Sequence, residues 1–246
     1  MNGLHVDFVK GRMRNAAVVL AVFALVGITV TAARNANDQT EHVSRSVALG
    51  PGGTLRVKSF SGRVTIAASD RAEVVVDALR RGTHERLERI TLDVHKDGDR
   101  VIVDANHRES SSWIYRHNNV VETDFDITVP RRTNLDIDVF SAPVAVTGVE
   151  GSYRVRTFSS RVRLNDVVWQ PHQTIDVKTF SGDVDVQVPA SATGSVSFDS
   201  FSGRLSSDLP LTLHSSRRRK VTAELGSGGD GQLRVRTFSG SARINR

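Results

Sequence analysis

The sequence contains no cysteine among its 246 residues, and it has only two Trp and two Tyr. The absence of cysteine excludes disulfides, thiolate metal sites and cysteine nucleophiles. The scarcity of aromatic residues other than Phe removes the platforms on which nucleic-acid bases stack. The net charge is also only +6. We therefore expect no nucleic-acid partner.

After residue 35 the sequence has no useful stretch of helical periodicity, and its one long apolar run lies at residues 16–33. This run follows the basic residues Lys10, Arg12 and Arg14 and ends in small residues. Such a pattern is typical of a secretory signal peptide, and the run is also long enough to span a bilayer as a helix. A cleaved signal and a retained membrane anchor both predict export of the rest, because positive charge stays inside.

The chain therefore divides into three segments. Residues 1–33 form the signal peptide or N-terminal membrane anchor, residues 34–47 a short linker, and residues 48–246 a β-repeat domain. The expected location is the periplasm or the cell surface, with anchoring in the cytoplasmic membrane if residues 16–33 are retained.

One phrase of alternating apolar and polar residues occurs six times in the exported part. The clearest copy, residues 175–186, reads IDVKTFSGDVDV. The six copies centre on Phe60, Phe140, Phe158, Phe180, Phe201 and Phe238. A period of two predicts strands with one buried face. The apolar parity changes across each Phe, so the chain must turn there. Ser-Gly suits a turn because Gly accepts positive φ, and it occurs at Gly62, Gly182, Gly203 and Gly240.

Four consecutive copies, at Phe140, Phe158, Phe180 and Phe201, are 18, 22 and 21 residues apart. This spacing without helical periodicity predicts an all-β, β-solenoid-like stack. Parallel rungs in register would place opposite charges of successive copies side by side, such as Lys178 and Asp199. We expect the Phe side chains to point inward and stack, because an exposed Phe in every rung would build a large apolar stripe.

A different region separates the copies at Phe60 and Phe140. Its alternating runs cover residues 73–77, 89–94, 100–104 and 122–129, with an Asp97-Gly98 hairpin signal between two of them. We interpret it as an insertion of antiparallel strands that caps the start of the solenoid.

The last rung, residues 233–244, is expected to end the stack. Residues 221–228 look like a degenerate rung that precedes it. The terminal rung is either shielded by residues 217–231 or paired with a second copy. A monomer is favoured, because Arg234, Arg236, Arg243 and Arg246 would repel a second copy.

This order of elements resembles the bacterial "putative adhesin" family of β-strand-repeat proteins, a domain of unknown function. The shared features are the rung at residues 57–64, the hairpin at 97–98, the strand ending at 129–130, the Phe-centred rungs, and the glycine-rich 226–229 before the last rung. Two copies depart from Ser-Gly, at Ala142 and Ser160. The resemblance covers residues 48–246 and implies a cell-envelope β-repeat protein. It supplies no catalytic residue.

Candidate catalytic groups are few. The carboxylate pairs Asp136/Asp138 and Asp183/Asp185 would suit a glycosidase only if they converged in a cleft. They alternate with arginines along strands, which favours solvated charge ladders. The eight histidines form no close ligand pair, so we assign no metal, cofactor or catalytic residue.

Candidate interaction residues occur in two places. Arg217, Arg218, Arg219 and Lys220 form either a site for anionic lipid or polysaccharide or a solvated loop. Trp113 and Tyr115 either stack on a sugar ring or fix a long loop to the sheet.

These observations favour a non-enzymatic scaffold or adhesion surface, with an envelope glycan or protein as its partner. A polysaccharide-active enzyme and a self-assembling structural protein are the alternatives.

Export is the first testable prediction. A C-terminal reporter enzyme that is active only outside the cytoplasm should be active, and one that is active only in the cytoplasm should be silent. The opposite pattern would contradict the interpretation of residues 16–33.

Overall fold

The computed structural model describes residues 30–32, 38–107, 120–217 and 219–246. Apart from a six-residue helix, α1 (His84–Arg89), every regular element in these ranges is a β-strand, so the all-β prediction is confirmed. No helix among the described residues is long and apolar enough to cross a membrane.

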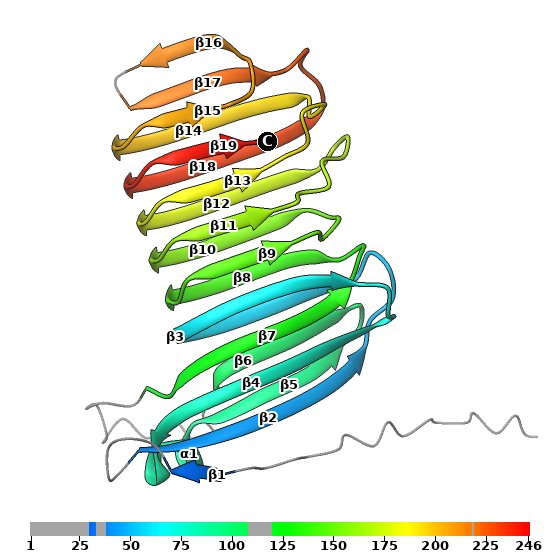
Figure 1. The fold of residues 1–246 in the computed structure, drawn as a ribbon, viewed down its shortest axis with the longest axis vertical. Coiled ribbons are helices and arrows are strands. Elements are labelled where there is room, and N and C mark those ends of the chain that lie inside the picture. Colours follow the sequence, from blue (N-terminus) through cyan, green and yellow to red (C-terminus); the bar gives the residue numbers. More distant parts are fainter. Residues whose placement is uncertain (1–29, 33–37, 108–119, 218) are drawn as a thin grey trace, which may run out of the picture.

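The strands form two sheets that share the long strand β3 (Thr54–Ser69), as Figure 1 shows. Sheet B has the spatial order β5 (Thr91–Asp97), β6 (Arg100–His107), β3, β8 (Asn134–Ser141), β10 (Tyr153–Ser159), β12 (Thr174–Ser181), β18 (Gly231–Ser239), β14 (Gly194–Ser202), β17 (Lys220–Leu225) and β16 (Leu211–Arg217). Sheet A has the order β1 (Val30–Ala32), β2 (Asp38–Ala48), β4 (Glu73–Thr83), β7 (Glu122–Pro130), β3, β9 (Val144–Thr147), β11 (Val162–Asn165), β13 (Val184–Gln187), β19 (Ala242–Asn245) and β15 (Leu205–Ser207).

Each Phe-centred copy forms one rung, with a longer strand in sheet B, a corner, and a shorter strand in sheet A. Rungs pair in parallel and in register, so that Val155 lies opposite both Ile137 and Val177. The alternating apolar residues face the space between the sheets, where Ile175, Val177 and Val184 are fully buried. The solenoid-like stack is therefore confirmed.

The glycines at the corners allow close approach between rungs. A Cβ on Gly240 would lie 2.2 Å from the carbonyl oxygen of Gly182, and a Cβ on Gly182 would lie 2.0 Å from that of Ser160. Gly182 has φ +148°, as the turn argument expected. Gly240 is not among the residues of positive φ, so at that corner contact with the next rung is the reason for Gly.

The C-terminal rung does not end the stack. Strand β18 lies between β12 and β14, with Leu233 opposite Ile175 on one side and Val196 on the other. Both outcomes expected for an exposed terminal rung are therefore wrong. The expected pairing of Lys178 with Asp199 is also wrong, because Lys178 lies opposite Arg236.

The far end of the stack is formed by β16 and β17, which pair antiparallel with each other. Strand β17 also pairs antiparallel with β14. Residues 221–228 therefore do not form a degenerate rung. They alternate as a rung does, and Ala223 and Leu225 are buried, but the chain runs in the reverse direction and has no Phe corner.

The near end contains the inserted strands. The predicted hairpin at Asp97-Gly98 joins β5 to β6 and is confirmed. Strand β4 pairs antiparallel with β2 and β7, whereas β6 and β7 pair in parallel with β3. The insertion therefore mixes both directions and was only partly predicted.

Most of the predicted linker belongs to the sheet. Residues 38–47 lie in β2, which pairs with β4 along its whole length. The polar sequence of β2 does not indicate a strand, because β2 is held to the sheet by backbone pairing and by the buried Arg80. The Arg80 side chain binds Glu41 of β2 and the carbonyl oxygen of Ile90. Burial lowers the pKa of Arg80, and the charge of Glu41 opposes this effect.

The predicted hydrophobic N-terminal helix lies outside the described residues, except at its end. There Val30–Ala32 form strand β1, which pairs antiparallel with β2. The expectation of a helix is therefore wrong for these three residues.

The glycine contacts predict a difference between two alanine substitutions. Gly240→Ala should lower the free energy of unfolding by about 1–3 kcal/mol, because its Cβ would push two rungs apart. Gly50→Ala is the matched control, because nothing lies within 4 Å of a Cβ there, and it should change stability by less than about 0.5 kcal/mol. Urea unfolding measures both, and equal losses would contradict the close-approach argument.

Candidate ligand-binding groove

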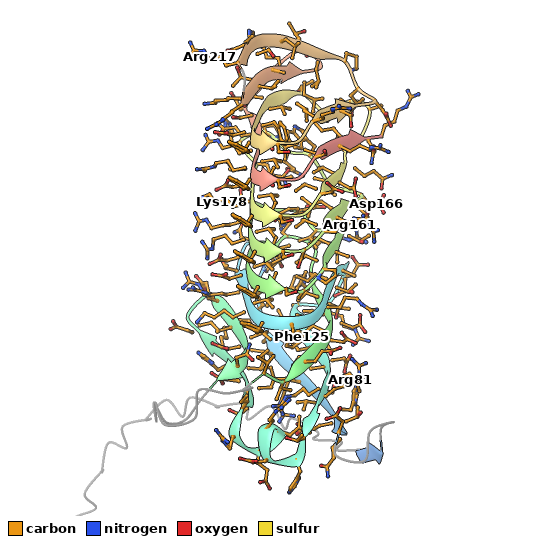
Figure 2. The ribbon with its side chains drawn as sticks, turned by 90° about the vertical axis from the view of Figure 1, so that its left-hand side faces the viewer. Arg81, Phe125, Arg161, Asp166, Lys178 and Arg217 are labelled. Atoms are coloured by element: carbon orange, nitrogen blue, oxygen red, sulfur yellow. The ribbon has the colours of Figure 1, made fainter. Side chains whose placement is uncertain are left out.

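The six repeated phenylalanines form one continuous stack along the corner between the sheets, which we call the Phe ladder. Its spatial order is Phe60, Phe140, Phe158, Phe180, Phe238 and Phe201. Neighbouring ring centroids are 4.7 to 5.0 Å apart, and the rings lie within 10° of parallel. Figure 2 looks onto this corner, with Lys178 on one side and Arg161 on the other.

The Phe ladder lies on the outside of the molecule, with its six residues 41% to 54% exposed. The expectation that these side chains point inward is therefore wrong. The parity shift falls on the residue pair after each Phe, so Phe180 keeps the outward direction of Lys178 while the intervening Thr179 is buried. Six half-exposed rings present roughly 500 Å² of apolar surface, which is at the upper end for a monomer.

Stacking leaves mainly the ring edges open to solvent. Each inner ring has a neighbour on both faces. At the far end the face of Phe201 is covered by Arg219, whose Cζ lies 4.3 Å from the ring centroid. The Phe ladder therefore offers an edge surface, and a sugar or base has no free inner face on which to stack.

A row of cations lies beside the Phe ladder, which we call the cation row. Arg156, Lys178 and Arg236 precede their Phe by two residues and lie opposite one another on adjacent strands. Asp138 precedes the row in the stack and Asp199 follows it. Like charges placed directly opposite each other destabilise a sheet.

The carboxylates nearby neutralise the cation row only in part. Arg156 Nη2 lies 3.2 Å from oxygens of Asp136 and Asp138. Asp176 lies between the other two cations, 3.8 Å from Lys178 Nζ and 3.5 Å from Arg236 Nη2. The single carboxylate of Asp176 therefore forms ion pairs with both Lys178 and Arg236.

Five rings of the Phe ladder, all except Phe60, and the cation row line one groove with a volume of about 800 Å³. Four cations and two carboxylates line it, namely Arg156, Lys178, Arg219, Arg236, Asp138 and Asp199. The groove is therefore apolar along the ladder and positively charged along one side.

The candidate carboxylates do not converge. Asp136 and Asp138 lie on β8 of sheet B within the ion pairs described above. Asp183 and Asp185 belong to the sheet A side, where Asp185 lies opposite Arg163 and Arg243. Among the residues that the structure describes, no group of three or more His, Asp or Glu could hold a metal ion.

The candidate interaction residues have different outcomes. Arg219 lines the groove, Arg217 ends β16, and Lys220 lies opposite Asp199 on β14. Arg218, Trp113 and Tyr115 lie outside the described residues. The groove itself was missed, because its two central cations are 58 positions apart and meet only through the inserted last rung.

Comparison with known proteins places the fold. The family described as Toastrack DUF4097 matches residues 119–245. A crystal structure of a putative cell adhesion protein from Clostridium sporogenes is 9% identical, with a TM-score of 0.59 over 83% of this chain and 99% of that chain. A putative adhesin from Bacteroides fragilis is also 9% identical, with a TM-score of 0.30 over 82% and 96%. No curated protein matches significantly.

The exposed position of the Phe ladder predicts a modest stability effect. Phe180→Ala should lower the free energy of unfolding by about 1–2 kcal/mol, because it removes two stacking contacts of a ring that is already half exposed. Phe198→Ala is the matched comparison, because Phe198 is only 3% exposed, and it should cost about 3–5 kcal/mol. Chemical denaturation measures both. A loss of stability for Phe180→Ala that exceeds the loss for Phe198→Ala would contradict an exposed Phe ladder.

Proposed function

The chain belongs to the Toastrack DUF4097 family, and from that premise we propose that it is a non-enzymatic interaction scaffold of the bacterial envelope. Its contact surface is the groove formed by the Phe ladder and the cation row. The C. sporogenes protein of the same fold is named as a putative cell adhesion protein, which agrees with an interaction role.

One observation carries this proposal: six phenylalanines occupy an exposed position of the rung. The core does not need them, because the columns at Ile175, Val177 and Val184 already fill the space between the sheets. An exposed Phe at each corner adds apolar surface and no buried core. Apolar patches of this size on soluble proteins commonly mark interaction sites.

The charges support a binding role over catalysis. Two carboxylates beside the groove, Asp138 and Asp176, are engaged by Arg156 and Arg236. A glycosidase needs two carboxyl groups that face each other across a bond, about 5 to 9.5 Å apart. A surface of apolar ring edges and cations is suited to holding a ligand.

The envelope location is part of the proposal. A basic flank and an apolar run at residues 16–33 predict export, and the β-repeat domain then displays its groove outside the cytoplasm. The residues before β1 are either removed or keep the protein at the membrane.

Co-sedimentation with isolated bacterial envelope fractions tests the proposed function. The full-length chain should be retained, and Phe158→Ser combined with Phe180→Ser should weaken its binding about thirtyfold, because two apolar contacts of about 1 kcal/mol each are lost. Circular dichroism checks that the variant is folded.

Leu213→Ser is the matched control, because Leu213 is also exposed but lies on β16 and outside the groove lining. It should be retained as the unchanged chain is. Equal retention of all three proteins would show that the Phe ladder is not the contact surface.

A further inference from the structure

We propose that the occupant of the groove is an anionic amphiphile with a single hydrocarbon chain, such as a long-chain carboxylate. Its chain lies along the Phe ladder, and its head group is bound by Lys178 and Arg236. This inference rests on the proposed function, because it names the ligand class of the same groove.

The Phe ladder suits a hydrocarbon chain better than a sugar, a base or a strand. The inner ring faces are covered by neighbouring rings, so stacking of planar ligands is blocked there. The sheet B strands are paired on both sides in this region, so a peptide cannot add as a further strand. What remains is a continuous row of ring edges, which contacts a featureless apolar chain by dispersion alone.

The length of the Phe ladder agrees with this class of ligand. Spacings of 4.8, 4.9 and 5.0 Å separate Phe140, Phe158, Phe180 and Phe238 in turn. An acyl chain that spans one leaflet of a bilayer is about 15 Å long. These three spacings, which join four rungs, therefore accommodate one such chain, and the cation row lies alongside the rungs of Phe158, Phe180 and Phe238.

The cation row selects the sign of the head group. Lys178 and Arg236 lie directly opposite each other and share Asp176, so the ion pairs of these two cations leave one positive charge in excess. Asp199 lies opposite Arg236 on the next strand. Arg219, at the end of the Phe ladder, has a ring as its described partner and adds positive charge to the lining. A bound carboxylate relieves the repulsion between Lys178 and Arg236, whereas a cationic head group increases it.

The shape favours a discrete molecule over a membrane surface or a second copy. A volume of about 800 Å³ lies within the range of about 300–1,000 Å³ that is usual for small-molecule sites. A second copy seated on the groove would bring its own cation row against Lys178 and Arg236. The apolar stripe of roughly 500 Å² is also smaller than the roughly 800 Å² that each partner buries in a stable interface.

Photolabelling with a diazirine analogue of dodecanoate tests the inference on the full-length chain. Peptide mapping should place the label on the strands that carry Phe158, Phe180 and Phe238. Unlabelled dodecanoate should compete at least about tenfold better than dodecyltrimethylammonium, which has the same chain and the opposite charge.

Two charge variants make the test specific. Lys178→Gln combined with Arg236→Gln should weaken dodecanoate competition about tenfold and should fold, because it removes a repulsion. Arg163→Gln combined with Arg243→Gln is the matched control, because these residues flank Asp185 on sheet A and do not line the groove. The control should change competition less than about twofold.

Several outcomes would overturn the inference. The first is labelling of peptides outside the groove. The second is equal competition by dodecanoate and dodecyltrimethylammonium, and the third is unchanged dodecanoate competition in the variant with Lys178→Gln and Arg236→Gln. Competition by phosphatidylglycerol vesicles but not by dodecanoate would assign the groove to a membrane surface, and competition only by an acidic amphipathic peptide would assign it to a protein. If envelope retention still depends on the Phe ladder in these cases, the proposed function stands and only the ligand class fails.

Discussion

Parallel pairing in register is the constraint on which the rest of the structure depends. When each rung hydrogen-bonds to the next without a shift, every position of the repeated phrase becomes a column along the stack. The apolar columns form the core, the corner glycines form a line of close contacts, and the outward Phe residues form the Phe ladder. A shift of one residue between two rungs would break all of these columns at once.

The inserted last rung determines which charges meet. Strand β18 lies between β12 and β14, so Lys178 faces Arg236 instead of Asp199. In the order of the sequence this column would have placed a lysine against an aspartate, as in a neutral ladder. The insertion instead extends the pair Arg156 and Lys178 into the cation row by adding Arg236. It also keeps the Phe ladder continuous, because Phe238 lies between Phe180 and Phe201.

Local periodicity predicted much of the fold. Alternation around Phe180 predicted the strands, their buried face and the corner, because each depends on residues that are neighbours in the chain. The direction of the Phe side chains was mispredicted, because alternation does not show on which residue of the corner the parity changes. The rung order and the role of β2 were also missed, because they depend on pairing between segments far apart in sequence. The candidate site was the least predictable feature, because its central pair, Lys178 and Arg236, belongs to rungs that are not consecutive in the chain.

The absence of cysteine allows a direct measurement of the rung order through introduced pairs. Adjacent rungs bring Cα atoms about 4.8 Å apart, within the range of a disulfide, whereas rungs two places apart are about 10 Å apart and too far. The full-length chain with cysteines in place of Phe180 and Phe238 should therefore form an intramolecular disulfide under mild oxidation, and the chain with cysteines in place of Phe180 and Phe201 should not. Cross-linking of the second pair and not the first would contradict the inserted rung, and with it the groove.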